Sequence, residues 1–244
     1  MTNIIKLNAT HSTNDFLKNI TSKQPTENFT IVMTESQTKG KGQRGNTWTT
    51  EPGKNLIFST LVKSLTNSEN SIFDLNIAVS ISIIEALETF KIPKLNIKWP
   101  NDILSEGKKI SGILIENTIS GQQYISSIIG IGLNVNQTNF ENLPKASSLK
   151  NITKKEFNKE ELLLEIINKM KDNHELISNH KSDILWEKYH NYLFKKEIPS
   201  VFELSNGTRF MGIIKKVQPN GKIQILLEND SLSEFDIKEA KLIY

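Results

Sequence analysis

A glycine-rich loop between two predicted strands constrains this chain more than any other feature. Residues 29–34 and 55–62 have the apolar pattern of buried strands. The polar residues between them contain Gly40-Lys41-Gly42-Gln43-Arg44-Gly45, which matches the dinucleotide fingerprint G-x-G-x-x-G. That fingerprint requires a helix directly after the glycines, because the helix N-terminus binds the pyrophosphate. A polar stretch and then a strand follow here, so the dinucleotide-binding interpretation fails.

Two other glycine motifs also fail. The phosphate loop G-x-x-x-x-G-K-[ST] is matched by Gly40, Gly45 and Thr47, but Asn46 stands where the lysine is required and no helix follows. A kinase-type loop would need H-R-D and D-F-G segments downstream, and the chain has neither. Two interpretations remain open. The segment is either a flexible surface loop, or a loop whose backbone N–H groups, Lys41 and Arg44 approach an anion.

The order of the remaining elements predicts a sheet backed by helices. The chain begins almost directly with a strand, and Ser12 with Asp15 forms a capping box that starts a short helix. Residues 74–90 have the apolar density of a helix buried against a sheet. The pattern further predicts strands at 95–98, 112–118 and 124–134, a turn at Ser120-Gly121, a loop at 140–155, and helices at 159–177 and 182–193 capped by Asn158 and Ser182.

The pattern changes after Phe194. Five short β segments follow, and the turn signals between them are Asn206-Gly207, Pro219-Asn220-Gly221 and Asn229-Asp230. Regularly spaced hairpins of this kind indicate a small β-barrel. We therefore expect two domains, one at residues 1–192 and one at residues 193–244.

Composition narrows the possible functions. The 244 residues include no cysteine, which excludes disulfides, thiolate nucleophiles and cysteine metal sites. No apolar run approaches the roughly 18 residues of a membrane span, and the N-terminus lacks the pattern of a secretion signal. The net charge of +3 is spread over many lysines, which favours a solvated surface, with an acidic protein partner as the alternative. We expect a cytoplasmic protein that contacts neither membrane nor nucleic acid.

Four further segments carry residues with the chemistry of a binding site. Residues 98–102 combine a cation, an amide and a carboxylate at a strand end, and residues 108–116 place Lys109 just before a buried strand. Residues 130–136 end a strand in small residues and two amides, and residues 12–14 open the first helix. Each segment alone has a purely structural explanation. Lys109 is then a solvated residue at a strand end, and Asp102 a turn former.

Taken together, these segments resemble a known family. Residues 37–48, 98–102, 109–116 and 130–136 are similar, in order and spacing, to the signature of biotin–protein ligases. The resemblance covers about residues 5–244. It implies an α+β fold, in which a mixed, mainly antiparallel sheet is backed by helices and followed by an SH3-like β-barrel. Since no N-terminal DNA-binding domain precedes the first strand, the chain is expected to be of the short, ligase-only type.

The resemblance also implies a reaction. Biotin would be activated with ATP and Mg²⁺ to biotinyl-5′-AMP and then passed to a lysine of a biotin carboxyl carrier protein, by a monomer or a homodimer. Lys109, Lys41 and Arg44 would be catalytic, with Lys109 between the carboxylate and the α-phosphate, and the glycine loop would close as a lid. Lipoate or octanoate transfer to a lipoyl domain is the alternative enzyme, because those enzymes share the fold. A binding module without activity is the alternative of a different class.

The implied site has two parts. The residues expected to bind biotin are Ser12, Thr13, Asn14, Gln37, Gly40, Lys41, Lys109, Gly112 and Gly132. The residues expected to bind ATP are Gly42, Gln43, Arg44, Trp48, Lys98, Asn101, Asp102 and Asn134, and Asp102 is also the candidate ligand for Mg²⁺.

The glycine loop departs from the family's common pattern, G-R-G-R-x-G. Lys41 replaces the first arginine and Gln43 the second, while Arg44 occupies the variable position. Lysine does not reproduce the bidentate contacts of arginine, and the amide of Gln43 removes one positive charge near the expected adenylate.

Overall fold

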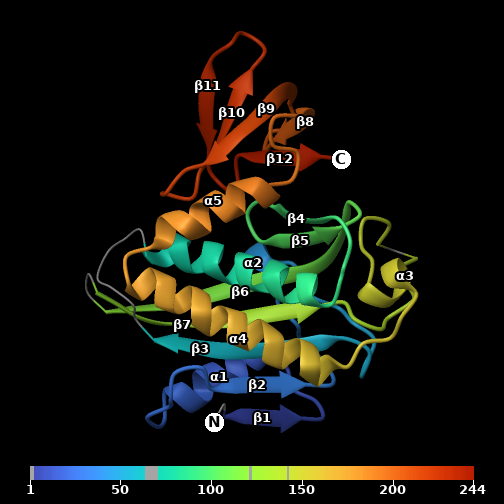
Figure 1. Cartoon of the computed structure of the whole chain (residues 1–244), viewed down its shortest axis with the longest axis vertical. Coiled ribbons are helices and arrows are strands. Elements are labelled where there is room, and N and C mark those ends of the chain that lie inside the picture. Colours follow the sequence, from blue (N-terminus) through green and yellow to red (C-terminus); the bar gives the residue numbers. More distant parts are fainter. Residues whose placement is uncertain (1–2, 64–70, 121–122, 142) are drawn as a thin grey trace.

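The computed structural model describes residues 3–63, 71–120, 123–141 and 143–244 (Figure 1). The predicted turn at Ser120-Gly121 lies partly outside this range. The first part of the chain forms β1 (Ile4–Leu7), α1 (Thr13–Thr21), β2 (Ile31–Thr34), β3 (Leu56–Lys63), α2 (Ser71–Thr89), β4 (Leu95–Lys98), β5 (Asp102–Ser105), β6 (Lys108–Ser120) and β7 (Gln123–Leu133). The second part forms α3 (Leu149–Thr153), α4 (Lys159–Ser178), α5 (Ser182–Tyr192), β8 (Pro199–Leu204), β9 (Arg209–Val217), β10 (Ile223–Leu227), β11 (Leu232–Phe235) and β12 (Ala240–Ile243).

The larger sheet has seven strands in the order β1-β2-β3-β7-β6-β5-β4. Only β1 and β2 run parallel, and every other neighbouring pair is antiparallel. This confirms the expected mixed, mainly antiparallel sheet backed by helices.

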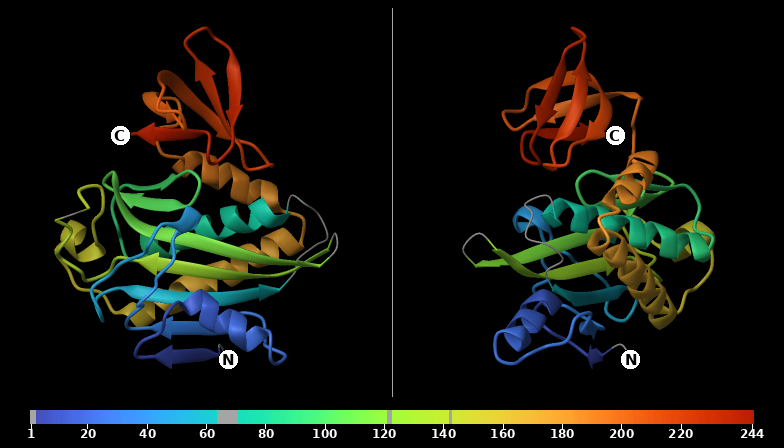
Figure 2. Two further views of the ribbon diagram at one scale, coloured as in Figure 1. Left: turned by 180° about the vertical axis from the view of Figure 1, so that it is seen from behind. Right: turned by 60° about the vertical axis from the view of Figure 1, so that its left-hand side comes forward.

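Helices α2, α4 and α5 cover one face of this sheet, whereas α1 and the glycine loop lie on the other face (Figures 1 and 2). The first face carries the main core. Helix α2 is apolar almost all round because it packs between the sheet and α4, so that Ile77, Ile81 and Ile84 are fully buried. The second face buries only a small cluster of Leu17, Val32, Leu61 and Ile128 beneath α1. Much of this second face is therefore not filled by core packing and can form a binding site.

Strands β8 to β12 form a second, open antiparallel sheet in the order β11-β10-β9-β8-β12 (Figure 1, top). All five predicted segments are present, and the predicted hairpin signals fall between them. The edge strands β11 and β12 are not neighbours in this order, so the sheet does not have the closed pairing expected of a barrel. Each edge strand pairs on one side only, β11 with β10 and β12 with β8.

The structure corrects several local predictions. The predicted loop at 140–155 contains helix α3, whose cap is Ser148, and β5 was not predicted. Both elements are too short for their hydrophobic period to be recognised in the sequence. Ser182 does not cap α5, because the cap position belongs to Lys181 and carries no side-chain hydrogen bond. Lys109 does not precede its strand but lies inside β6.

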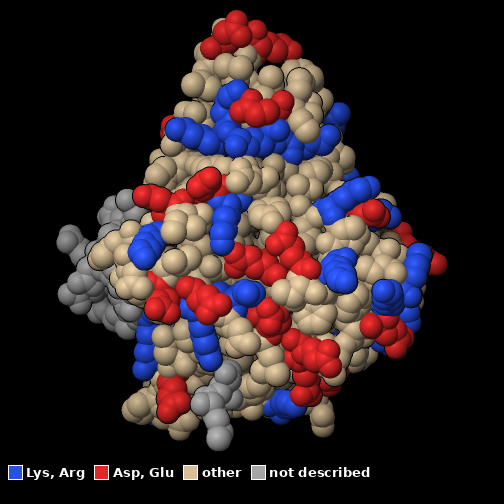
Figure 3. Space-filling model, in the orientation of Figure 1, with Lys and Arg blue, Asp and Glu red and all other residues tan. Residues whose placement is uncertain are grey.

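Charged side chains of both signs are interspersed over the helical face of the molecule (Figure 3). A band of basic residues crosses the second sheet, and acidic residues gather at its tip. Among the described residues, no helix is long and apolar enough to cross a membrane.

The cap of α4 provides a test of the helical layer. Asn158 accepts hydrogen bonds from the backbone N–H groups of Glu160 and Glu161. Replacing it (Asn158→Ala) leaves both donors without their partner, so we expect the free energy of unfolding to fall by about 1 kcal/mol in denaturant titrations. Asn158→Asp keeps an acceptor at this position and is expected to retain the stability of the original protein. Equal losses in the two variants would contradict the capping role.

Candidate active site

The centre of the open sheet face is bare backbone. Gly112 in β6 pairs directly with Gly132 in β7, so two neighbouring positions on this face have no side chain. Ile57 of β3 continues the same row beside Gly132. Since side chains alternate between the two faces of a sheet, Ile113 and Ile131 next to these glycines point into the main core. The row forms a flat floor on which another group can lie close to the backbone.

A bulge in β6 aims Lys109 at this floor. Positions 109 and 112 are three residues apart, so regular alternation would place their side chains on opposite faces. The register between β5 and β6 shifts between Ile103 and Leu104, which inserts one extra residue into β6. As a result a Cβ atom at Gly112 would lie 3.4 Å from Nζ of Lys109, which places both on one face.

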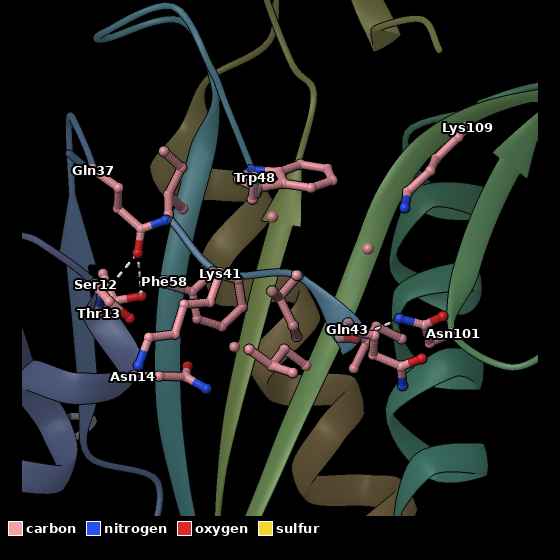
Figure 4. Close-up of a pocket in the computed structure, with 18 residues that line it drawn as sticks. Ser12, Thr13, Asn14, Gln37, Lys41, Gln43, Trp48, Phe58, Asn101 and Lys109 are labelled. Atoms are coloured by element: carbon pink, nitrogen blue, oxygen red, sulfur yellow. Dashed lines mark hydrogen bonds between the residues drawn. The ribbon is translucent and has the colours of Figure 1, made fainter. Parts of the chain in front are cut away.

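The first turn of α1 brings a buried polar cluster to one end of the floor. Ser12 caps the helix, and Thr13 donates from its backbone N–H to Oε1 of Gln37 over 2.8 Å. The hydroxyl of Ser59 lies 2.7 Å from Oγ1 of Thr13 and 2.6 Å from Oδ1 of Asn14. Figure 4 shows Gln37, Thr13 and Asn14 together on the side of the cavity opposite Lys109.

Asn14 occupies space that a glycine leaves open. A Cβ atom at Gly130 would lie 2.4 Å from Oδ1 of Asn14, so any larger residue at position 130 would displace this side chain. The amide of Asn14 donates to Oε2 of Glu116 over 2.7 Å. Asn14 is thus held by three neighbours, Ser59, Gly130 and Glu116, that come from β3, β7 and β6.

The glycine loop folds back on itself as a small hairpin. Lys41 and Thr47 form an isolated antiparallel bridge, and the backbone N–H of Trp48 donates to the carbonyl of Gly40 over 3.0 Å. A Cβ atom at Gly40 would lie 2.3 Å from the carbonyl oxygen of Trp48, which explains glycine at this position. Gly45 at the tip adopts φ +79°, a conformation that favours glycine.

The hairpin is tied to α1 by an ion pair. Nζ of Lys41 lies 2.6 Å from Oδ1 of Asp15, and both side chains are about half exposed. The hydrogen bond to Asp15 raises the pKa of Lys41 above its ordinary value, with a smaller contribution from the charge of Glu116. Lys41 therefore remains a cation and joins the loop to the helix that carries the polar cluster.

Trp48 lies across the bare floor. A Cβ atom at Gly132 would lie 2.3 Å from Cε2 of the indole, and one at Gly112 would lie 3.2 Å from Cζ3. The remaining cavity between the polar cluster and Lys109 has a volume of about 50 Å³. Sites for small molecules usually measure roughly 300–1,000 Å³, so a ligand on this floor requires the indole to move. Among the described residues the buried Nε1 of Trp48 has no hydrogen-bond partner.

A charged corner adjoins the other side of Lys109. Its Nζ lies 2.6 Å from Oδ1 of Asp102, while Nζ of Lys98 lies 3.4 Å from Oδ2 of the same carboxylate. Burial lowers the pKa of Lys98, and the charge of Asp102 partly offsets that effect. One carboxylate thus holds two lysines in position with one net positive charge left over.

A second cavity of about 400 Å³ opens at this corner, between the glycine loop and the second sheet. Its polar lining includes Lys98, Asp102 and Lys109, and its apolar lining includes Phe202 and Ile223. Lys109 and Trp48 line both cavities, so the polar cluster and the charged corner communicate through them.

The structure brings most of the predicted site residues together. The first cavity is lined by Ser12, Thr13, Asn14, Gln37, Lys41, Gly42, Gln43, Trp48, Asn101, Lys109, Gly112 and Gly132. Lys98 and Asp102 line only the second. Gly40 lies in the hairpin, and Asn134 is buried with its amide donating to the carbonyl of Ser147, so neither lines these cavities. The side chain of Arg44 lies outside the described part of the structure, and its role stays a prediction.

Four residues that complete the site were not among the predicted site residues, although Glu116 and Gly130 lie within the segments 109–116 and 130–136 that carry the family resemblance. Asp15 holds Lys41, Glu116 and Gly130 hold Asn14, and Ser59 joins Thr13 to Asn14. Ser59 had a recognisable signal, since it is a polar residue within the apolar run of β3 and is fully buried. Such a residue needs a buried partner. The other three have ordinary structural explanations in the sequence.

The sequence matches the profile of the biotin/lipoate A/B protein ligase family over residues 7–134, slightly more than half of the chain. The chain belongs to the biotin/lipoate A/B protein ligase family. The match spans the polar cluster, the glycine loop, the charged corner and the two strands, β6 and β7, that carry the glycines of the floor.

Individual members of this ligase family show the same similarity. The chain is 33% identical over 108 residues to the bifunctional ligase/repressor BirA of Bacillus spizizenii, which covers 44% of this chain and 33% of that protein. It is 30% identical over 122 residues to the biotin–[acetyl-CoA-carboxylase] ligase of Mycobacterium tuberculosis, which covers 49% and 44% of the two chains. The aligned parts therefore make up less than half of these curated relatives.

A solved structure extends the ligase comparison to the whole chain. The fold is similar to that of the biotin protein ligase from Aquifex aeolicus in complex with biotin and ATP, with a TM-score of 0.82 and 28% identity. The alignment covers 100% of this chain and 99% of the other. The similarity includes the second sheet as well as the part matched by the family profile.

The ion pair between Asp15 and Lys41 provides a test of the hairpin. An exposed pair contributes about 0.2–1 kcal/mol, so Asp15→Asn is expected to raise the population of open hairpin about 1.4-fold to fivefold. Initial rates of tryptic cleavage within residues 39–45 report that population.

The matched control is Glu160→Gln, which breaks the exposed pair between Lys6 of β1 and Glu160 of α4 (2.7 Å). Its cleavage rate is expected to equal that of the original protein. Equal rates in the two variants would show that the pair with Asp15 does not restrain the hairpin.

Proposed function

We propose that this protein is a biotin–protein ligase, which activates biotin with ATP to biotinyl-5′-AMP and transfers the biotinyl group to a lysine of a biotin carboxyl carrier protein. The observation that carries the proposal is the position of Lys109, whose side chain lines both a polar cavity and a charged one. Membership of the family and the full-length similarity to a ligase in complex with biotin and ATP support this choice of acid and nucleotide.

The polar cluster suits the head group of biotin. A ureido group offers two N–H donors and one carbonyl acceptor, and Ser12, Thr13 and Gln37 provide hydroxyl and amide groups that can pair with them. The floor of Gly112 and Gly132 allows a flat apolar ligand to approach the backbone once the indole of Trp48 moves. The acid's carboxylate then points toward Lys109.

The first half-reaction joins two anions. A carboxylate oxygen of biotin attacks the α-phosphorus of ATP, the bond to the β-phosphate oxygen breaks, and pyrophosphate leaves. The ammonium of Lys109 can neutralise the carboxylate and the developing charge on the phosphoryl oxygens. Its ion pair with Asp102 holds it at that position before the substrates arrive.

In the second half-reaction the neutral amine of the carrier's lysine attacks the biotinyl carbonyl. An amide bond forms and the anhydride bond breaks, and AMP leaves with the proton that the amine nitrogen loses. Water would compete for the same anhydride, so the site must exclude it. The hairpin of the glycine loop, joined to α1 by Lys41 and Asp15, is suited to act as the cover.

Magnesium is expected to accompany ATP. Among the described residues no group of three or more histidine, aspartate or glutamate side chains could hold a metal ion. Asp102 is the carboxylate of the charged corner, and a single carboxylate fits an ion that is bound mainly through the nucleotide phosphates and water. When bound, such an ion neutralises phosphate charge.

Several finer assignments belong to this proposal. Residues 1–192 would form the catalytic domain, and residues 193–244, with five antiparallel strands, would form an SH3-like domain. Arg44 and Asn134 would contact ATP, and Gly40 would lie near biotin. The enzyme would act in the cytoplasm as a monomer or homodimer, without nucleic acid.

The reaction itself is tested by exchange of labelled pyrophosphate into ATP, with biotin, lipoate or octanoate as the acid. Exchange with biotin alone is the expected result, because only the first half-reaction run in both directions produces it. Exchange with lipoate or octanoate but not biotin would assign the chain to the lipoate branch. A protein that exchanges with none of the three acids would be a binding module.

The role of Lys109 is tested by Lys109→Ala in the same assay. Loss of a well-placed group that stabilises transition-state charge costs about 3–4 kcal/mol, so we expect kcat to fall about 10²–10³-fold. The control is Lys108→Ala, which removes the exposed neighbouring lysine and should leave kcat unchanged. A kcat of the Lys109 variant within about threefold of this control would overturn the assigned role.

A further inference from the structure

Three hairpin turns in the second sheet share one pattern of two hydrogen bonds. In the turn at 204–208, Gly207 donates to the carbonyl of Leu204, and the side chain of Asn206 accepts from Thr208. The turn at 218–222 repeats both bonds with Gly221 and Asn220, and the turn at 227–231 repeats them with Asp230 and Asn229. The residues at the corresponding positions 207, 221 and 230 all have positive φ, of +84°, +85° and +61°.

The third turn shows that this hydrogen-bonding pattern tolerates a side chain at the position with positive φ. Asp230 occupies the position that glycine fills in the other two turns, and aspartate is among the residues that adopt positive φ most readily. Gly207 also has open space around it, since a Cβ atom there would meet nothing within 4 Å. Neighbouring atoms therefore do not require glycine in either of these two turns.

Gly221 is different because its turn is docked onto the larger domain. A Cβ atom at Gly221 would lie 2.5 Å from Cε2 of Phe73 in α2. The ring of Phe73 is stacked on Trp186 of α5 at 5.8 Å, so it cannot move aside freely. The carbonyl of Gly221 accepts a buried hydrogen bond of 3.0 Å from Nε1 of Trp99.

Trp99 stands inside the charged corner of the site. It is directly preceded by Lys98 and followed two residues later by Asn101, whose amide donates to the carbonyl of Ile113 over 2.7 Å. Trp99 itself is 9% exposed and packs in the main core, and it lines the second cavity together with Lys98 and Asp102 on either side. The indole N–H is thus the point at which the second sheet holds this segment.

A second contact from the same sheet lies beside Lys98. The ring of Tyr244, which follows β12, lies 5.4 Å from Nζ of Lys98 and 5.2 Å from the ring of Phe194. Burial raises the pKa of the Tyr244 hydroxyl, and the negative charge of Asp102 adds to this effect. Residues 98–102 therefore lie between two contacts from the second sheet.

We infer that the turn at 218–222 is a positioning element for the nucleotide site, in which Gly221 holds Trp99 and thereby sets Lys98 and Asp102. Trp99 and Gly221 are positioning residues, because they act through Lys98 and Asp102 and not on the reacting atoms. The inference rests on the proposed function, since it assumes that the corner of Lys98 and Asp102 binds the phosphates of ATP. It predicts that disturbing this turn weakens ATP binding while leaving the biotin cavity intact.

The matched pair of turns supplies the experiment. Gly221→Asn and Gly207→Asn introduce the same side chain at the same position of the same type of turn, and asparagine tolerates positive φ. Only the side chain at 221 meets Phe73. We expect Gly221→Asn to raise the Kd of ATP, measured by titration calorimetry, about threefold to tenfold, which corresponds to loss of one hydrogen bond. The Kd of biotin should stay within about twofold of the original value.

Trp99→Phe removes the donor but keeps an aromatic ring in the core, and it should raise the Kd of ATP by a similar factor. The Kd of ATP for the double variant should not exceed the higher of the two single-variant Kd values, because both changes remove the same contact between Trp99 and Gly221. A purely structural role would lower the melting temperature or the fraction of active protein without a selective change in the Kd of ATP.

The outcomes separate this inference from the proposed function. An original protein that binds ATP but shows no exchange with biotin would contradict the proposed function. An original protein that performs exchange, together with equal Kd values for ATP in the Gly221 and Gly207 variants, would overturn the inference alone. Equal weakening of ATP and biotin binding in the Gly221 variant would also overturn it, since the turn would then support the whole domain rather than the nucleotide corner.

Discussion

The site depends on a pair of glycines that face each other across two central strands. Gly112 and Gly132 leave the backbone bare in the middle of a seven-stranded sheet, where a side chain would normally stand. Glycine within a strand loses packing and conformational entropy. The opposite face offsets this weakness, because its row of isoleucines packs beneath α2 in the main core. A sheet with one strongly buried face can keep the other open for a ligand.

The difference between the buried face and the open face of the sheet also explains the position of the charged groups. Lys109 reaches the open face only because the register shift in β6 reverses the regular alternation of side chains. Once there, it shares the carboxylate of Asp102 with Lys98, so that two cations are held by a single anion. The remaining positive charge faces a cavity, which is the arrangement that an anionic substrate requires. Gln43 lines both cavities and adds no charge, so the described cations around them come from the strands and from Lys41 rather than from position 43.

Much of this architecture could be predicted from local patterns. The cap at Ser12, the buried helix α2, the strands on both sides of the glycine loop and the five C-terminal strands all follow from periodicity and turn residues. The composition of the site could also be predicted, because four ordered segments resemble one family. The bulge that aims Lys109 could not, since no residue in β6 marks where an extra position enters a ladder. The hydrogen bond that fixes Asn14 to Glu116 joins residues 102 positions apart, and local patterns contain no information about such a pair.

Trp48 lies at the predicted nucleotide site, but its indole also has a second position-dependent role that the sequence did not predict. It was expected beside ATP, and it does line the cavity at the charged corner. Its indole also covers the glycine floor, with its N–H buried and without a partner among the described residues. A buried donor of this kind carries an unfavourable desolvation free energy, which is relieved when the indole moves to a place where the N–H can be paired. Movement of the indole away from the floor would allow this N–H to be paired, and a ligand with apolar surface can then replace the indole on the same two glycines.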